Sequence, residues 1–309
     1  MIKEVSKMKT VRVGTRNSPL ALKQTMIVLD LLKEVHGDFP VEIVPMTTKG
    51  DRLLSVSLSK IGGKGLFINE VEQALLEHSI DFAVHSLKDM PAKVADGLTL
   101  TAIPERSNPN DCLIFRKVTT VEGLPIGARI GTSSLRREFQ MKNLREDLQV
   151  ESIRGNVGTR LKRMEEQKLD GIVLAVAGLK RLNWFDEPTH PYTILTSEQC
   201  IPAVGQGALA VECRSQDKEM NDFLKPIDDS TTRKLVMEER AFLAMLNGNC
   251  DIPIGAFACQ KQDGYHFSGF LGDKELQQSY SKTVIVKELK DVGKSVAQDL
   301  LNAMSEDEL

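Results

Sequence analysis

Short segments rich in β-branched residues alternate with amphipathic stretches over the first part of the chain. Four of these segments predict strands, at residues 10–15 (TVRVGT), 41–46 (VEIVPM), 81–85 (DFAVH) and 98–103 (LTLTAI). Apolar residues at helical spacing predict one helix between Ser18 and Gly37 and another over 67–78. Ser18 suits the cap of the first helix, Pro19 its first turn and Gly37 the residue after its end. This alternation is typical of an α/β layer with a largely parallel sheet.

The same alternation begins again after a polar run at 106–112 (RSNPNDC), which predicts a hinge or a domain boundary. Strands are expected at 128–132 (ARIGT), 148–153 (LQVESI) and 171–178 (GIVLAVAG), and helices at 134–144 and 157–167. A later segment, 208–213 (ALAVEC), predicts a strand that returns to the first unit. Two connections would then join the units, and a ligand would belong in the cleft between them.

The last part of the chain has a different order of elements. A helix is expected from Thr231, then strands at 254–259 (IGAFAC), 265–270 (YHFSGF) and 282–287 (KTVIVK), and a final helix near 292–304. This order predicts a small α+β domain. We therefore predict three domains, formed by residues 1–106 with 203–226, by 107–202 and by 227–309.

Composition and charge narrow the class of protein. A length of 309 residues, 41% hydrophobic residues and 27% charged residues are typical of a globular protein with more than one domain. The formal net charge of −3 gives no general attraction to nucleic acid or to anionic lipid. The start MIKEVSKMKT lacks the apolar run of a signal peptide, and no stretch has the length of a membrane span. We expect a cytoplasmic protein with no nucleic-acid or membrane partner.

The cysteines and histidines do not form a recognised ligand pattern. Five cysteines without a C-x-x-C pair argue against a disulfide framework and a zinc site. The five histidines lack H-E-x-x-H spacing, so we expect no metal site built on them. Cys250 lies among small and polar residues in LNGNCDIPIG, where an accessible thiol could act as a nucleophile or pack inertly.

Cationic, hydroxyl and amide side chains recur just after the predicted strands. The set comprises Arg16, Ser18, Ser86, Lys88, Ser133, Ser134, Arg136, Arg137, Arg154, Asn156, Arg160 and Arg181. Ligands of open α/β sheets bind at the carboxyl ends of the strands. A single arginine there could be a solvated surface residue, but several together favour a ligand with several carboxylates. Asp89, the acid among them, could stabilise a cationic intermediate or bond nearby backbone.

Two glycine-rich segments carry competing hypotheses. The segment KIGGKGLF lacks the spacing of a phosphate loop, and it predicts a mobile lid with Lys64 and Phe67, or only a surface loop. The segment GQGALA at 205–210 matches G-x-G-x-x-A and is the best argument for a dinucleotide site. No clear strand precedes it and no acidic residue stands at the expected distance, so the match is weak.

Taken in order, the motifs of the chain resemble those of the porphobilinogen deaminase family. They are TRNSPLAL, GGKGLF, HSLKDMP, IGTSSLRR, RGNVGTRL, AVAGLKRL, PAVGQGA, ERAFLAML and NGNCDIPIG. The resemblance covers almost the whole chain. It implies an α/β fold of two periplasmic-binding-protein-like lobes with a cleft between them, plus a small α+β C-terminal domain.

The resemblance also implies an activity and a cofactor. A member of the family is a cytoplasmic, monomeric transferase of tetrapyrrole (haem) biosynthesis. It condenses four porphobilinogen molecules on a dipyrromethane primer, releases ammonia each time, and then releases the linear tetrapyrrole hydroxymethylbilane. By resemblance Cys250 holds the primer by a thioether, and Asp89 is the catalytic acid that stabilises the azafulvene cation. Lys64 and Phe67 belong to the active-site loop.

The remaining site residues follow from the same motifs. By resemblance, cofactor or substrate is contacted by Arg16, Ser18, Ser86, Lys88, Thr132, Ser134, Arg136, Arg137, Arg154, Asn156, Arg160 and Arg181. The chain departs from the family at Asn249, where glycine, serine or alanine usually precedes the cysteine. Asparagine tolerates left-handed backbone angles, so the loop should form while cofactor loading is in question.

Two other functions compete with this interpretation. A bilobed protein that binds an anion without converting it would have the same core, but it would carry no covalent adduct at Cys250. A nucleotide-dependent oxidoreductase built on GQGALA would bind a nicotinamide cofactor.

Overall fold

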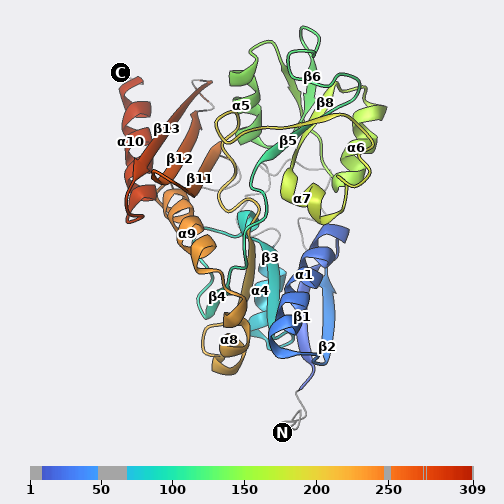
Figure 1. The fold of residues 1–309 in the computed structure, drawn as a ribbon, viewed down its shortest axis with the longest axis vertical. Coiled ribbons are helices and arrows are strands. Elements are labelled where there is room, and N and C mark those ends of the chain that lie inside the picture. The colour runs from blue at the N-terminus through green and yellow to red at the C-terminus, as the bar shows by residue number, and fades with distance from the viewer. Residues whose placement is uncertain (1–8, 48–67, 247–251, 274, 276, 308–309) are drawn as a thin grey trace.

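The fold consists of three α/β or α+β units, each built on its own sheet (Figure 1). The structure is a computed structural model that describes residues 9–47, 68–246, 252–273, 275 and 277–307. The first two units stand one above the other in Figure 1, and the third packs beside them. None of the helices in these residues is long and apolar enough to cross a membrane.

The first sheet has five strands in the order β2-β1-β3-β10-β4. The strands are β1 (Val11–Arg16), β2 (Val41–Met46), β3 (Phe82–Ser86), β4 (Leu98–Ala102) and β10 (Leu209–Arg214). The helices of this unit are α1 (Pro19–His36), α4 (Asn69–Leu76) and α8 (Lys218–Leu224), with short 3₁₀ turns η1 (Leu87–Asp89) and η2 (Lys225–Ile227). Strand β10 comes after the second unit in the chain and joins the first sheet between β3 and β4, as the sequence predicted.

The second sheet also has five strands, in the order β7-β6-β8-β5-β9. The strands are β5 (Asp111–Phe115), β6 (Arg129–Gly131), β7 (Gln149–Glu151), β8 (Gly171–Ala175) and β9 (Tyr192–Ile194). The helices are α5 (Leu135–Leu144), α6 (Val157–Glu166) and α7 (Val176–Arg181). The third sheet is antiparallel, with β11 (Ile254–Lys261), β12 (Gly264–Asp273) and β13 (Gln278–Val286), and its helices are α9 (Ser230–Met245) and α10 (Val292–Asp307).

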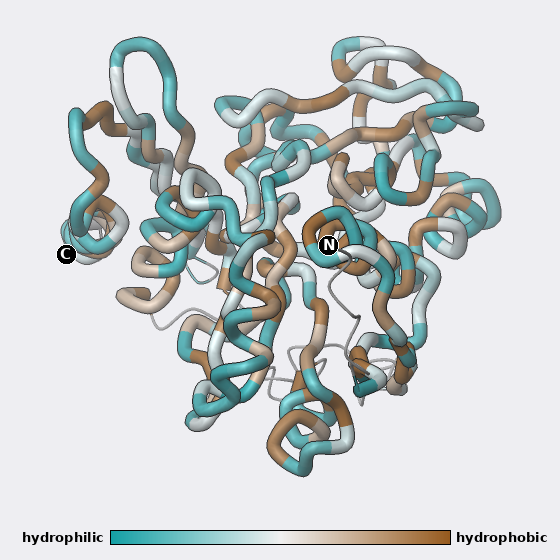
Figure 2. The backbone as a smooth tube through the Cα atoms, turned by 60° about the horizontal axis from the view of Figure 1, so that its bottom comes forward, coloured by the Kyte–Doolittle hydropathy of each residue, from teal (hydrophilic) through white to brown (hydrophobic). Residues whose placement is uncertain are grey.

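Helix α1 shows how local sequence places residues of the first unit. The Ser18 side chain accepts a hydrogen bond from the Ala21 amide at 3.2 Å, Pro19 occupies the first turn, and Gly37 ends the helix at φ +76°. These are the cap residues expected from the sequence. Buried residues of α1, Val28 and Leu29 among them, pack against the first sheet. Figure 2 shows hydrophobic and hydrophilic residues interleaved along the helices, as a helix with one buried face requires.

Each sheet of the first two units contains one reversed strand, but its other four strands run in one direction, so the expectation of a largely parallel sheet is confirmed. Strand β1 pairs in parallel with β2 and β3, but β10 runs antiparallel to both β3 and β4. In the second sheet β5 runs antiparallel to β8 and β9. The reversed strands are β5 and β10. Each is the strand by which the chain enters a sheet after it crosses from one unit to the other.

Two elements differ from the sequence prediction. Strand β5 was not predicted: it begins at Asp111, inside the run expected to be a hinge or boundary, and is buried throughout. The strand expected over 171–178 stops at Ala175, where helix α7 begins. Apolar residues alone do not distinguish a buried strand from a short buried helix, which explains the second error.

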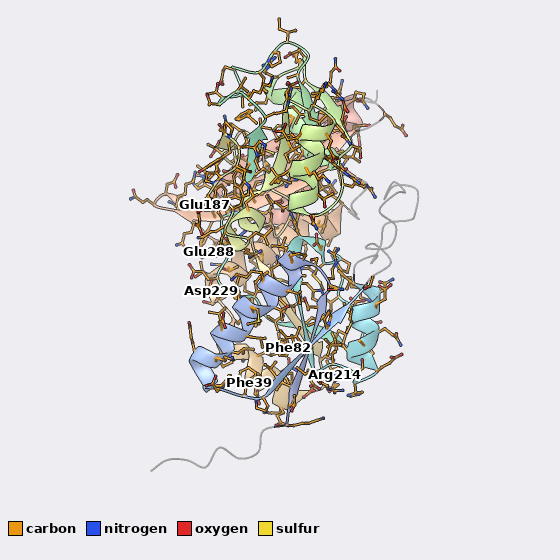
Figure 3. The ribbon with its side chains drawn as sticks, turned by 90° about the vertical axis from the view of Figure 1, so that its right-hand side faces the viewer. Phe39, Phe82, Glu187, Arg214, Asp229 and Glu288 are labelled. Carbon is orange, nitrogen blue, oxygen red and sulfur yellow. The ribbon has the colours of Figure 1, made fainter. Side chains whose placement is uncertain are left out.

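Large apolar side chains fill the interior of each unit. Phe82 at the start of β3 is fully buried beside Leu29 and Leu32 of α1 in the core of the first unit. Phe82 and Phe39 are labelled in the lower part of Figure 3, where this unit lies. Phe242 and Phe267 fill the corresponding place in the third unit. Separate cores let each sheet present its strand ends as a rigid platform.

Candidate active site

A cleft opens where β1 and β3 end and α1 begins. It is lined by Arg16, Ser18, Leu20, Ala21, Gln24, Ile68, Val84, His85, Ser86 and Asp89. Gln24 reaches across from α1 and donates to the Ser86 hydroxyl at 2.8 Å. Asp89 stands in η1, directly after β3, with an exposed side chain. Parallel strands that end at one edge thus bring together residues that lie far apart in the sequence.

Lys88 has an unusual electrostatic position beside this cleft. Burial, together with the positive charge of Arg137, lowers the pKa of its ammonium group to about 8, although the negative charge of Asp89 acts in the opposite direction. Its Nζ donates a hydrogen bond to the Gln206 side chain at 3.4 Å. A bound anion would stabilise the charged form of an ammonium group whose charge is disfavoured in this way.

Helix α6 of the second unit contributes more positive charge to the same neighbourhood. Burial lowers the pKa of Arg160 to about 10, and the nearby charges of Arg137 and Arg154 act in the same direction. Arg160 Nε donates to the Gly155 carbonyl at 2.7 Å, and Asn156 caps the helix by accepting from the Thr159 amide at 2.9 Å. Asp89 opposes this shift, so its charge and these arginines act on one another across the two units.

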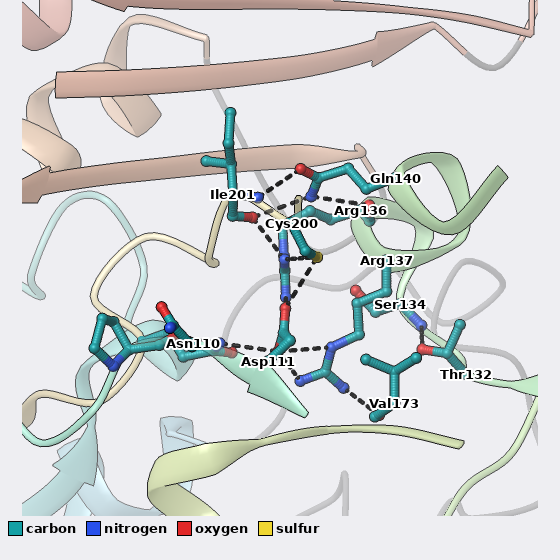
Figure 4. Close-up of polar contacts among 12 residues, drawn as sticks. Asn110, Asp111, Thr132, Ser134, Arg136, Arg137, Gln140, Val173, Cys200 and Ile201 are labelled. Carbon is teal, nitrogen blue, oxygen red and sulfur yellow. Dashed lines mark hydrogen bonds and ion pairs between the residues drawn. The ribbon is translucent and has the colours of Figure 1, made fainter. Parts of the chain in front are cut away.

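Asp111 lies at the centre of a buried network between the units (Figure 4). Its two carboxylate oxygens pair with Arg136 Nη2 and with Arg137 Nη2, each at 2.7 Å. Gln206 Nε2 donates to the same carboxylate at 2.9 Å and joins this network to Lys88. Burial alone would raise the pKa of Asp111, but the charges of Arg136 and Arg137 hold it well below its usual range.

Sequence reasoning missed Asp111, Gln206 and Cys200. The Cys200 thiol donates to Asp111 Oδ2 at 3.3 Å, and burial raises its pKa to about 12, which disfavours the nucleophilic thiolate. A carboxylate that opens a fully buried strand was the one available signal for Asp111, because such a charge needs a partner. Thr132 and Ser134 meet at the start of α5, where the Ser134 amide donates to the Thr132 hydroxyl at 3.2 Å.

Arg181 lies apart from the cleft that holds Asp89. It is the last residue of α7 and donates from Nη2 to the Gly207 carbonyl at 2.7 Å, while burial lowers its pKa to about 10. It lines a second groove, with Ile27 and Leu31 of α1. Lys64, Phe67 and Cys250, together with Asn249, lie outside the described residues.

The dinucleotide hypothesis fails on the geometry of GQGALA. This segment leads into strand β10, whereas a dinucleotide fingerprint leads from a strand into a helix. Gly205 and Gly207 serve the crossing between the units, at φ +69° and φ +92°. A Cβ at Gly207 would lie 2.4 Å from the Ser107 carbonyl, so close packing of two backbones explains this glycine.

These features define a two-lobed α/β protein with a small third unit and a cationic site for a ligand with several carboxylates. The chain belongs to the porphobilinogen deaminase family. The family profile described as porphobilinogen deaminase, dipyromethane cofactor binding domain, matches residues 11–222, and the profile of the C-terminal domain matches residues 234–302.

Close relatives carry the same description. Porphobilinogen deaminase from Listeria monocytogenes serotype 4b is 45% identical over 294 residues, which is 95% of each chain. The enzyme from Streptococcus sanguinis is 49% identical over 271 residues, covering 87% of this chain and 89% of that one. Among solved structures, a nutrient binding protein from Burkholderia cenocepacia bound to methionine has a TM-score of 0.43 at 13% identity and covers 70% of this chain and 90% of that chain.

Membership of this family gives the activity. The protein is a transferase of tetrapyrrole biosynthesis that condenses four porphobilinogen molecules on a dipyrromethane cofactor, with release of ammonia and then of hydroxymethylbilane. The binding-protein and oxidoreductase alternatives are therefore wrong. The site fits such a cofactor because its cations have pKa values lowered by burial and by one another, and pyrrole carboxylates would relieve both effects.

Proposed function

We propose that the Asp89 cleft and the cations around it are the site where porphobilinogen units are added. The observation that carries this proposal is that Lys88 of the first unit and Arg160 of the second both have lowered pKa values, and that the charges of Arg137 and Asp89 act on both of them. Positive charge gathered around one exposed carboxylate suits a substrate whose carboxylates are held while a cation forms between them. The arginines would hold the acetate and propionate groups, and Asp89 would stabilise the azafulvene cation left by ammonia.

The other assigned residues have supporting roles in this proposal. Ser18 and Asn156 cap helices α1 and α6, and both would also present hydrogen-bond donors to carboxylates. Arg16 and Ser86 would contact the incoming unit because they share the cleft with Asp89. Thr132, Ser134, Arg136, Arg154 and Arg181 would contact the bound chain. The dipyrromethane, when bound, supplies the pyrrole on which the chain begins, and Cys250 would hold it, with Lys64 and Phe67 in the loop over it.

A single set of proteins tests the attachment and the reaction centre. The intact mass of the purified protein should exceed the sequence mass by a dipyrromethane, and Cys250→Ser should remove this excess while the control Cys259→Ser keeps it. Asp89→Asn, loaded with preformed hydroxymethylbilane, should fold and carry the adduct but lose most of its turnover, by at least about 100-fold. An adduct that persists in Cys250→Ser, or near-normal turnover in Asp89→Asn, would contradict the proposed role of that residue.

The organisation of the protein completes the proposal. We place the domain boundaries at 1–106 with 203–226, 107–202 and 227–309, since each range contains one of the three sheets. A cytoplasmic location is supported by the four described cysteines, all of which are unpaired. A monomer without nucleic-acid or membrane partners is supported by the net charge of −3 and by exposed large apolar residues that are scattered, such as Val35, Ile126 and Ile285.

A further inference from the structure

A buried imidazole and carboxylate stand side by side in the wall of the Asp89 cleft. His85 Nε2 and Glu212 Oε2 are 3.0 Å apart, and Glu212 has no exposed surface while His85 is only 6% exposed. Strands β3 and β10 create the pair, because His85 lies opposite Ala210 and Glu212 stands two residues further along the same face. His85 also lines the cleft that contains Asp89. The pair thus connects the cleft with the interior of the first unit.

The surroundings of this pair contain more acceptors than donors. Glu72 of α4 is close enough that, after burial, the charge of Glu212 raises its pKa. Within the described residues, one carboxylate oxygen of Glu72 and one of Glu212 are buried without a hydrogen-bond partner. Arg240 of α9 lies within electrostatic reach of Glu212, but its Nη2 donates to the Pro91 and Ala92 carbonyls at 2.8 and 3.0 Å. Among these groups, the imidazole of His85 is the hydrogen-bond partner that Glu212 Oε2 has.

The hydrogen bond to Glu212 also selects which ring nitrogen carries the proton. A carboxylate accepts only, so neutral His85 holds its proton on Nε2 and keeps a lone pair on Nδ1. No described residue hydrogen-bonds Nδ1. On the cleft side, the charged groups that share the wall with His85 are Arg16 and Asp89. An imidazole oriented by a carboxylate, with its other nitrogen free beside a substrate cleft, is the arrangement of a general base.

We propose that His85 accepts the proton released in each condensation and that Glu212 is the positioning residue that orients it. This inference rests on the proposed function, since it takes the Asp89 cleft as the site of addition. The division of work is then simple. Asp89 stabilises the cation that forms when ammonia leaves, and His85 removes the proton that the new bond makes acidic.

The step balances without a redox partner. The C–N bond of porphobilinogen breaks, and ammonia leaves with the electron pair. A C–C bond forms between the methylene carbon and the free α-carbon of the preceding pyrrole, which from the second addition onward is itself a former porphobilinogen. The C–H bond at that carbon then breaks, its electrons restore the aromatic ring, and the proton passes to His85 Nδ1. The imidazolium, stabilised by Glu212, gives the proton to the released ammonia, which becomes ammonium.

The kinetic test uses His85→Gln with porphobilinogen deuterated at its free α-carbon. The His266→Gln variant is a matched control, because His266 forms a similar pair with Asp263 at 2.7 Å on the surface of the third unit. In His85→Gln, kcat should fall on the order of 100-fold, which is typical for loss of a general base. A primary isotope effect larger than that of the wild type should appear as well, because removal of the α-proton becomes rate-limiting. The His266→Gln control should have the kcat and the isotope effect of the wild type.

A second measurement is independent of turnover. Nitrogen-15 NMR of the histidine side chains should show His85 with its proton on Nε2 when neutral, and the His85→Gln spectrum assigns its signals. Glu212→Gln should disturb this preference and reproduce the isotope effect, which keeps the proposal open to test if His85→Gln does not fold. Intact mass confirms that each variant carries its dipyrromethane.

Three results would overturn the proposal: an unchanged kcat in folded His85→Gln, a lower kcat without a larger isotope effect, or neutral His85 protonated on Nδ1. The second of these would mean that the pair only supports the structure. A wild-type protein that carries no adduct and shows no turnover would instead contradict the proposed function, and it would not bear on the role of His85 in particular.

Discussion

At the scale of single residues, Lys88 has a pKa that burial brings close to neutral pH. Its pKa of about 8 results from burial and from the charge of Arg137, and a bound carboxylate should raise that value. The affinity for the carboxylate is then highest below about pH 8, where Lys88 is protonated in the free enzyme. It falls as the pH rises from there toward the higher pKa of Lys88 in the complex. The KM for porphobilinogen should increase over this range.

The matched variant for this prediction is Lys88→Arg, which keeps its charge at all these pH values. Its KM should stay flat between about pH 7 and pH 10, apart from changes shared with the wild type. Lys180→Arg, outside the cleft, should keep the wild-type profile. A wild-type KM that is flat over the same range would show that the charge of Lys88 does not contribute to binding.

The residue scale also shows what the sequence could predict about the site. Arginines at strand exits are visible in the sequence because strand exits follow from the periodicity, and the structure does bring Arg137, Arg154 and Arg160 together. The partner of Arg136 and Arg137 could not be predicted, because Asp111 stands 26 residues before Arg137 and meets it only through the pairing of β5 with β8. The pairs His85–Glu212 and Arg106–Glu239 were missed for the same reason.

At the scale of elements, the crossing at 205–208 connects the first two units and depends on Gly207. Its φ of +92° disfavours side chains, and an added Cβ would lie 2.4 Å from the Ser107 carbonyl oxygen. Gly207→Ala should therefore lower the free energy of unfolding by about 1–3 kcal/mol or more, as measured by urea denaturation.

Gly158→Ala is the control for this substitution. Gly158 lies in α6, where an added Cβ would meet nothing nearer than Asn156 Oδ1 at 3.8 Å. This change should leave stability equal or raise it by up to about 1 kcal/mol. Equal stability of the two variants would mean that the backbone at Gly207 can move aside, and that the crossing is not fixed by close packing.

Elements differ in how well the sequence predicts them. Helix α1 was predicted with its caps because Ser18, Pro19 and Gly37 signal its ends locally. Strand β5 was missed because its start overlaps a polar run, and its burial depends on neighbours that come later in the chain, β8 and β9. The direction of β10 was also beyond the sequence, since a hydrophobic pattern does not reveal whether a strand runs parallel or antiparallel to its neighbours.

At the scale of the whole molecule, Glu239 of α9 joins the third unit to both chain crossings. One carboxylate oxygen accepts from Arg106 Nη1 at 2.6 Å and from the Ala258 amide at 2.9 Å. The other accepts from the Gly205 amide at 2.7 Å. The carboxylate is fully buried, and its hydrogen bonds connect three segments: β11, the crossing at Gly205 and the other crossing, at Arg106. Figure 1 shows α9 in the corresponding place, beside the third sheet and next to the first unit.

Glu239→Ala should therefore weaken the attachment of the third unit more than the units themselves. It leaves the Arg106 guanidinium and two amides buried without their acceptor, which costs roughly 3–5 kcal/mol when one partner of a buried pair is lost. Calorimetry of the wild type should show units that unfold together, whereas Glu239→Ala should show a separate transition of the third unit at lower temperature. Glu219→Ala, at an exposed position of α8, should keep the wild-type profile. A single transition in Glu239→Ala, shifted as a whole, would mean that the apolar contacts between the units suffice to couple them, and that Glu239 stabilises the molecule without determining how its parts are joined.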